Sequence, residues 1–126
     1  MVERMRCELF PGDLDVAVTF YVDVLGFTVE RDERSSASPY VALERGTVHV
    51  GLARREEAVD VDHRRPPVGV ELVLEVGDEV SDLVAARDRA VGAGWPLDED
   101  LTARPWGLVD FRLLDPAGYY WRITTG

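Results

Sequence analysis

The sequence is poor in the side chains that build disulfides and metal sites. Its 126 residues include one cysteine, Cys7, and two histidines, His49 and His63. A single cysteine excludes an intrachain disulfide framework, and two histidines argue against a histidine-built zinc site. Cys7 falls in the first expected strand, where we interpret it as a small core residue rather than a nucleophile.

Lysine, asparagine and glutamine are absent, and so is any long apolar run. All 14 basic residues are arginines and stand against 24 acidic residues, which gives a net charge of -10. Without an apolar run of about 18 residues or a basic-then-apolar N-terminus, we expect a cytoplasmic protein with no membrane partner. The acidic surface should repel nucleic acid and attract cationic ligands, although simple solubility explains the same charge.

The first part of the chain predicts a strand, a helix and three further strands. Asp13 is a good N-cap because its carboxylate can accept amides of the first helical turn, and apolar residues then recur at helical spacing up to Leu25. Gly26 is typical of the position just after a helix. The expected elements are a strand at Arg6 to Phe10, a helix from Leu14, a strand at Phe27 to Glu30, and a hairpin of Tyr40 to Glu44 with Thr47 to Leu52.

The same order then begins again after a charged segment without apolar periodicity, Ala53 to Pro67. Val70 to Val76 alternates like a strand, Gly77-Asp78 repeats Gly12-Asp13, and a second helix follows from Val80. Leu97 to Trp106 is expected to be an acidic loop. A hairpin closes the chain, turning at Asp115-Pro116-Ala117-Gly118, where aspartate, proline and glycine favour a tight turn.

This internal duplication predicts an α+β fold of two βαβββ modules. One helix covers one face of each sheet, so the opposite faces can curl around a cleft. We expect one domain over residues 1–126, with module one at 1–52, a linker at 53–67 and module two at 68–126.

Several motifs resemble those of the vicinal oxygen chelate superfamily, which includes glyoxalase I, extradiol dioxygenases and bleomycin-resistance proteins. The resemblance covers almost the whole chain. The motifs are Asp13-Leu14, Phe20-Tyr21, Val24-Leu25-Gly26-Phe27, Gly77-Asp78, Pro105-Trp106-Gly107 and Asp115-Pro116-Ala117-Gly118.

In metal-dependent members of that superfamily each module supplies two ligands from strand positions that face the cleft. The resemblance places these positions at Arg6, Val50, Glu71 and Arg122, of which only Glu71 can bind a divalent metal. A register slip of one residue would instead present Cys7 and His49, but it would turn the cores inside out. The sequence is therefore most similar to the metal-free, bleomycin-resistance-like branch, and we expect no metal and no cofactor.

Arg6, Glu71 and Arg122 can form a charge-assisted cluster across the cleft. This cluster is either a structural salt bridge or a polar floor that orients a ligand. The resemblance gives Trp106 a stacking role against a flat ligand, unless it only packs beneath its loop. The other candidates for the wall of the cleft are Tyr120, Phe10 and Tyr40.

The preferred function is metal-independent binding of a flat, cationic small molecule, of the kind used in antibiotic sequestration. The alternative is a lyase, isomerase or dioxygenase of the same superfamily that uses Glu71 as a base or metal ligand. Arginine neighbours would lower the pKa of Glu71 and weaken it as a base. We also expect a homodimer, with the modules paired either within one chain or across a swapped dimer.

Overall fold

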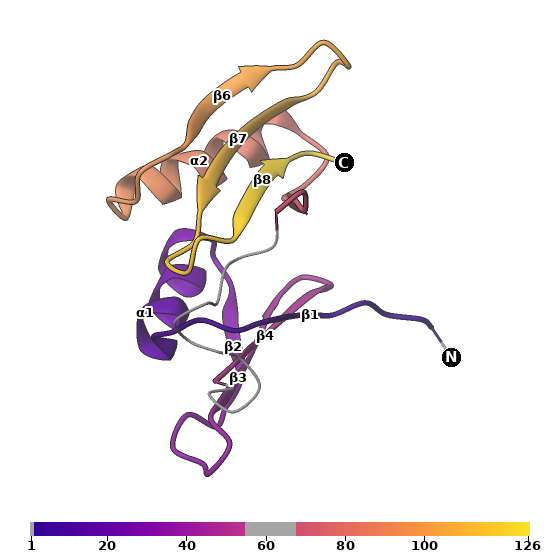
Figure 1. The fold of residues 1–126 in the computed structure, drawn as a ribbon. Coiled ribbons are helices and arrows are strands. Elements are labelled where there is room, and N and C mark those ends of the chain that lie inside the picture. The colour runs from indigo at the N-terminus through magenta and orange to yellow at the C-terminus, as the bar shows by residue number, and fades with distance from the viewer. Residues whose placement is uncertain (1, 55–67) are drawn as a thin grey trace.

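The computed structural model describes residues 2–54 and 68–126 and contains two modules of the same order (Figure 1). The elements of the first module are β1 (Cys7–Leu9), α1 (Leu14–Thr19), η1 (Phe20–Val24), β2 (Thr28–Asp32), β3 (Tyr40–Arg45) and β4 (Val48–Ala53). Those of the second are β5 (Leu72–Glu75), α2 (Val80–Gly92), β6 (Glu99–Ala103), β7 (Val109–Leu114) and β8 (Tyr120–Thr124).

Each module forms a four-stranded sheet with the same topology. The orders are β1-β4-β3-β2 and β5-β8-β7-β6, and in each sheet the first strand runs parallel to the last strand of its module. The helices α1 and α2 lie on the same side of the molecule in Figure 1. This arrangement confirms the predicted α+β fold of two βαβββ modules.

Local chemistry explains how the first helix begins and ends. Asp13 is the N-cap, and its Oδ1 accepts a hydrogen bond from the Val16 amide at 3.0 Å. The helix then widens into the π-helical turn η1, and Gly26 follows at a φ of 76°, a left-handed conformation that glycine adopts without strain. The second helix begins at Val80, as expected, and Glu79 is its N-cap and forms a capping box with Asp82.

One buried hydrogen-bonded group joins the two modules. Tyr21 of η1 is 0% exposed and donates its hydroxyl proton to Asp115 Oδ2 at 2.6 Å. The indole Nε1 of Trp121, on β8, donates to the same hydroxyl at 3.1 Å. Apolar residues of both modules surround this group in a single core cluster. The core therefore depends on both modules packing together.

Asp115 also organises the closing turn that the sequence predicts. Its Oδ1 accepts hydrogen bonds from the amides of Ala117 at 2.9 Å and Tyr119 at 2.8 Å. Gly118 takes a φ of 91°, as the turn requires. The same carboxylate thus holds the β7–β8 turn through one oxygen and the first module through the other.

The expected acidic loop at Leu97 to Trp106 is wrong in part, because Glu99–Ala103 forms the edge strand β6. All five of its residues are exposed, so the segment has no apolar alternation that would identify a strand. Pairing with β7 creates this strand, with an irregularity between Glu99 and Thr102. Tertiary context therefore overrides composition here. Likewise, β2 extends to Asp32, two residues past the expected end of that strand at Glu30.

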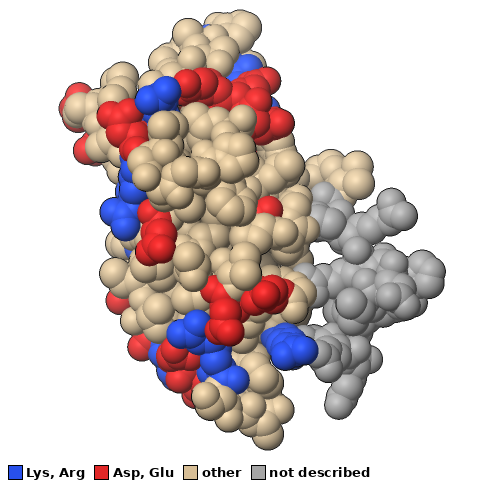
Figure 2. Space-filling view, turned by 90° about the vertical axis from the view of Figure 1, so that its left-hand side faces the viewer, with Lys and Arg blue, Asp and Glu red and all other residues tan. Residues whose placement is uncertain are grey.

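Of the expected linker at 53–67, residues 55–67 lie outside the described residues. Ala53, its first residue, belongs to β4. In the part of the chain that the structure describes, no helix has the length and apolar character needed to cross a membrane. Figure 2 shows one side of the surface, where acidic and basic side chains lie close together at the upper end, along the left edge and at the lower end, and uncharged residues occupy most of the middle.

Candidate functional site

Strand alternation decides which side chains face away from the helices. In the first sheet Leu43 pairs with Val50, and both are buried in the core at 0% and 1% exposure. The adjacent pair, Glu44 and His49, therefore points to the opposite face, as does Tyr40. We call this side the cleft face; in the second sheet it carries Arg112 and Tyr120, among others.

Val50 is the one predicted ligand position that lies on the opposite face of its strand from the one expected. The expectation that Val50 faces the cleft is wrong, because its side chain belongs to the hydrophobic core. Its neighbours in β4, His49 and Gly51, lie on the cleft face instead. The resemblance misplaced this position by one residue, and one residue of register moves a side chain to the other face of its strand.

A groove lies at the junction of the modules, where residues of the edge strands β1 and β5 and of the start of β8 line it. It encloses about 310 Å³. Its lining consists of Glu8, Leu9, Phe10, Val70, Leu72, Tyr119 and Tyr120. Phe10 and Tyr120 are thus two of the predicted wall residues, and the Phe10 amide donates to the Tyr119 hydroxyl across the junction at 3.3 Å. Among the described residues around this junction groove, Glu8 alone is charged.

Glu8 is a candidate residue that the sequence interpretation missed. Its carboxylate accepts hydrogen bonds from the Tyr40 hydroxyl at 3.0 and 3.1 Å and from Arg6 Nε at 2.7 Å. A side chain at Gly51 would collide with this pair, since a Cβ there would lie 2.2 Å from the Tyr40 hydroxyl oxygen. Two sequence signals were available: Glu8 alternates with Arg6 and Phe10, and a glycine within a strand often marks a close approach.

Tyr40 therefore supports Glu8 and is not among the residues lining the junction groove. Burial first, and then the hydrogen bond to Glu8 and the charge of Glu8, raise the pKa of Tyr40, so its hydroxyl remains a donor to the carboxylate. Cys7 lies between Arg6 and Glu8 on the chain and is partly buried. Burial, and then the charge of Glu8, raise the pKa of the Cys7 thiol, which disfavours the thiolate needed for nucleophilic attack.

The cleft face of the second sheet carries a chain of ion pairs. Glu71 contacts Arg122 through Oε1 and Nε, and its other oxygen lies 4.0 Å from Arg112 Nη1. Arg112 Nε lies 3.4 Å from Asp110 Oδ1 and 3.8 Å from Glu99 Oε2. Because each carboxylate lies beside a guanidinium, the network neutralises its own charge.

Asp110 and Arg104 anchor the outer end of this network. The Asp110 side chain is 1% exposed and accepts from Arg104 Nη2 at 2.8 Å. Burial is the largest influence on Asp110 and acts to raise its pKa, but hydrogen bonds and charge from Arg104 and Arg112 together outweigh it and lower that pKa. Asp110 therefore stays ionised and holds both arginines in place. Arg104 also contacts Glu99 on β6.

The structure divides the predicted Arg6–Glu71–Arg122 cluster. Glu71 and Arg122 form a pair as expected, but Arg6 pairs with Glu8 on its own strand. Arg112, which the sequence interpretation did not select, takes the place beside Glu71. The reason is proximity along and across strands: Arg6 and Glu8 share a strand face, and Arg112 pairs directly with Arg122.

The family-type metal positions do not fit a metal ion. Arg6 and Arg122 carry guanidiniums, which have no acceptor atom and stay protonated. Glu71 is the remaining oxygen donor of the predicted set, and Arg122 contacts one of its carboxylate oxygens. Replacing Val50 by its cleft-face neighbour His49 would still supply only two donors, fewer than a structural or catalytic zinc site uses.

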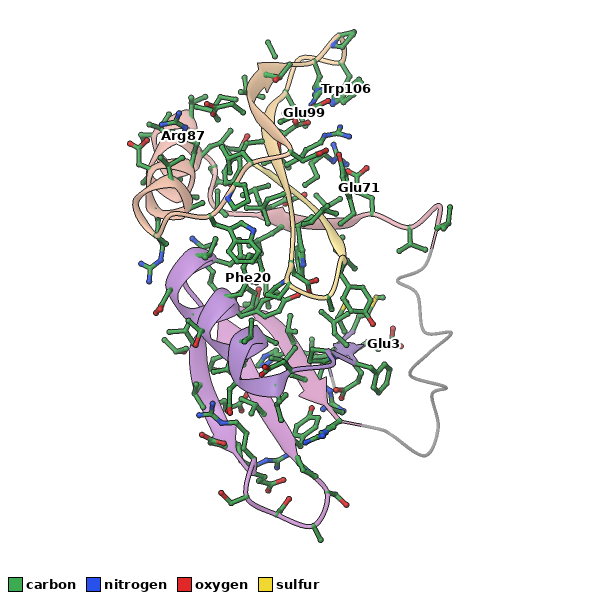
Figure 3. The ribbon with its side chains drawn as sticks, turned by 60° about the vertical axis from the view of Figure 1, so that its left-hand side comes forward. Glu3, Phe20, Glu71, Arg87, Glu99 and Trp106 are labelled. Carbon is green, nitrogen blue, oxygen red and sulfur yellow. The ribbon has the colours of Figure 1, made fainter. Side chains whose placement is uncertain are left out.

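Trp106 lies at the tip of the β6–β7 connection, beyond the ion-pair network. In Figure 3 it stands above Glu99 and Glu71, and its exposure is 59%. Trp106 is not among the residues that line the junction groove. Its predicted stacking role therefore requires a ligand that extends along the second sheet. By contrast, Trp121 is in the core, and Trp95 packs on Phe20 with ring centroids 4.8 Å apart.

Comparison with known proteins agrees with this geometry. The sequence model described as "Glyoxalase/Bleomycin resistance protein/Dioxygenase superfamily" matches residues 5–123. A comparison with curated proteins gives no match.

Solved structures of similar fold span nearly the whole chain. TioX from Micromonospora sp. ML1 is 25% identical with a TM-score of 0.76, covering 98% of this chain and 98% of TioX. A lactoylglutathione lyase from Agrobacterium tumefaciens is 22% identical with a TM-score of 0.73, covering 98% of this chain and 93% of the lyase. A glyoxalase/bleomycin resistance protein/dioxygenase from Nocardioides is 20% identical with a TM-score of 0.71, covering 99% and 85%.

Proposed function

The chain belongs to the glyoxalase/bleomycin resistance protein/dioxygenase superfamily, and from this premise we propose that it binds a flat, cationic small molecule without a metal ion at the family-type positions. The observation that carries the proposal is the composition of the junction groove. One carboxylate, Glu8, stands there among apolar and aromatic side chains. An apolar pocket with a single charged group is suited to a ligand that combines a ring system with one positive charge.

The aromatic side chains of the groove supply most of the attraction. Phe10, Tyr119 and Tyr120 offer ring faces and edges to a planar ligand, and stacking of aromatic pairs contributes about 0.5–1.5 kcal/mol beyond burial of area. The volume of about 310 Å³ fits a compact ring system. Enclosure of the ligand, rather than chemical change, is the mechanism.

Glu8 supplies the charge selectivity. Its carboxylate has two hydrogen-bond donors in Tyr40 and Arg6, and its side chain is still 32% exposed, so it can accept from a ligand as well. The net charge of -10 would speed the arrival of a cation. A carboxylate bonded to a cationic ligand contributes about 1.5–3 kcal/mol.

A catalytic alternative would use Glu71 as a base. Arg122 contacts the Glu71 carboxylate and Arg112 lies 4.0 Å from it, so proton acceptance would have to compete with these arginines. The ion pairs therefore favour a structural role for Glu71. Antibiotic sequestration is the corresponding biological role, with one ligand held per site and no turnover.

The test is a fluorescence titration with a planar cationic acridine dye and with acridone, a neutral compound of similar shape. We expect the dye to bind more tightly than acridone. Glu8→Gln should weaken the dye by about 10–100-fold and leave acridone nearly unchanged. Glu33→Gln is the matched control, because it removes the same charge from an exposed carboxylate that pairs with Arg31.

Two outcomes would contradict the proposal. If Glu8→Gln and Glu33→Gln affect the dye equally, recognition is not local to the groove and reflects net charge alone. If a compound is converted to product with multiple turnovers, and Glu71→Gln abolishes that turnover in a folded protein, the enzyme alternative replaces binding.

A further inference from the structure

A second group of ligating side chains lies on the cleft face of the first sheet. It contains none of the four family-type positions, although one of its members comes from β4, the strand that also carries Val50. The carboxylates of Glu30 and Glu44 and the imidazole of His49 bring one ligand atom each to within 4.8 Å of one another. They come from β2, β3 and β4, three neighbouring strands of one sheet. None of the three belongs to the junction groove or to the ion-pair network.

The strand register brings these residues together. Glu44 and His49 are direct cross-strand partners, so their side chains leave the sheet side by side. Glu30 is the extra residue of a bulge, since Val29 pairs with Leu43 and Arg31 with Ala42. A bulge re-aims a side chain relative to regular alternation. Here the Glu30 carboxylate reaches the imidazole of the next strand but one.

The separation of His49 and Glu30 is closer to that of two ligands of one metal ion than to that of a hydrogen bond. His49 Nδ1 and Glu30 Oε2 are 3.5 Å apart, longer than the range of about 2.7–3.2 Å for an N–H···O bond. Two ligands of a tetrahedral zinc ion with bonds of about 2.0–2.1 Å lie about 3.4 Å apart. Glu30 is 49% exposed, so its side chain can adjust, whereas His49 at 25% is held by the sheet.

We propose that Glu30, Glu44 and His49 form a binding site for one divalent zinc-like transition-metal ion. Imidazole nitrogen and carboxylate oxygen are both common zinc ligands, and three protein ligands leave a coordination position for water. Ligands presented by adjacent strands are better oriented than ligands on loops. This site goes beyond the proposed function, because the groove ligand needs no contact with it.

The surrounding charges sharpen the expected selectivity. Arg4, Arg6 and Arg31 line the same hollow as Glu30 and His49. Arg6 pairs with Glu8, and Arg31 pairs with Glu33 at 3.3 Å. The positive charges of these arginines repel a cation that is attracted by charge alone. An ion that forms a direct bond to the imidazole is therefore favoured. Mg²⁺, which prefers an all-oxygen octahedral shell, should not bind at the same concentration.

Isothermal titration of the metal-free protein with Zn²⁺ alone tests the site, with Co²⁺ absorption reporting its coordination. We expect one Zn²⁺ per chain, a weakening of at least about tenfold in His49→Ala and in Glu44→Gln, and weaker binding at acid pH because protons compete for the ligands. His63→Ala, which changes the other histidine of the sequence, should bind like the wild type.

The variants also separate this site from the groove and from the family-type positions. Glu8→Gln should keep zinc binding, and His49→Ala should keep acridine binding. The proposal is overturned if the wild type shows no saturable binding, if His49→Ala binds like the wild type, or if zinc is lost in His63→Ala or Glu71→Gln instead. Thermal melts confirm that each variant is folded before its titration is interpreted.

Discussion

Replacing Tyr21 by phenylalanine tests whether the modules depend on the buried group that joins them. The substitution keeps the ring in the core and removes only the hydroxyl. That hydroxyl donates to Asp115 Oδ2 at 2.6 Å and accepts from Trp121 Nε1 at 3.1 Å. Both partners are buried, at 5% and 3% exposure, so water cannot easily replace the lost bonds.

The magnitude follows from these two bonds. A hydrogen bond to a charged group contributes about 1.5–3 kcal/mol, and a buried donor left without a partner costs about 1–3 kcal/mol. Because Asp115 keeps its bonds to the turn amides, we expect Tyr21→Phe to lower the free energy of unfolding by about 2–4 kcal/mol. At about 3–5 °C per kcal/mol for a domain of this size, Tm should fall by about 6–20 °C.

Chemical and thermal unfolding followed by circular dichroism provide the measurement. Tyr40→Phe is the matched control, since its hydroxyl bonds to the partly exposed Glu8 and its loss should cost less than about 1 kcal/mol. If Tyr21→Phe is no less stable than Tyr40→Phe, the buried group does not hold the modules together and the reasoning is refuted.

The pH dependence gives a second measurement on the same residue. Burial first, and then the charge of Asp115 and its hydrogen bond, raise the pKa of Tyr21 well above its ordinary value. A raised folded-state pKa means that this stability is fully present below the pKa of an unfolded tyrosine, about 10, and is lost as the pH rises toward the folded value. The wild type should therefore lose stability more steeply above that pH than Tyr21→Phe does.

Four further predictions concern other parts of the molecule. Glu71→Ala should lower the free energy of unfolding by about 1–2 kcal/mol in a denaturant titration, less than the 3–5 kcal/mol of a fully buried pair, because the Glu71 side chain is 34% exposed. Glu71→Gln should cost less stability, and equal losses in the two variants would contradict the ion-pair account. Hydrogen bonds from Arg87 and then the Leu101 amide lower the pKa of Asp100 to about 2. Carboxyl NMR should therefore show Asp100 ionised at pH 3, and its pKa should rise toward the ordinary value in Arg87→Ala, where the Leu101 amide bond remains. For a flat cation long enough to extend from the groove along the second sheet, Trp106→Ala should weaken binding at least about tenfold and Trp106→Phe less, whereas equal affinity in a folded Trp106→Ala would make it a surface residue. Sedimentation at micromolar concentration should give twice the chain mass of 14.1 kDa, and a lone 14.1 kDa species would exclude the homodimer.

The sequence alone determined the elements that depend on short-range chemistry. Asp13 caps its helix, and Gly26 and Gly118 take positive φ where a helix end and a turn require it. The repeated order of elements then predicts two modules, because each amphipathic helix needs a sheet face to cover. These signals are local in the chain, so they can be interpreted without knowing which residues meet in space.

The tertiary structure decided what depends on register and on pairing between distant segments. Val50 faces the core, although the resemblance placed it on the cleft face. Arg6 pairs with Glu8 rather than with Glu71. The bulge that turns Glu30 toward His49 leaves no mark in the sequence. In a strand one residue of register exchanges the two faces, and a site is a property of one face. For that reason the fold could be predicted from the sequence, whereas the detailed membership of its sites had to come from the structure.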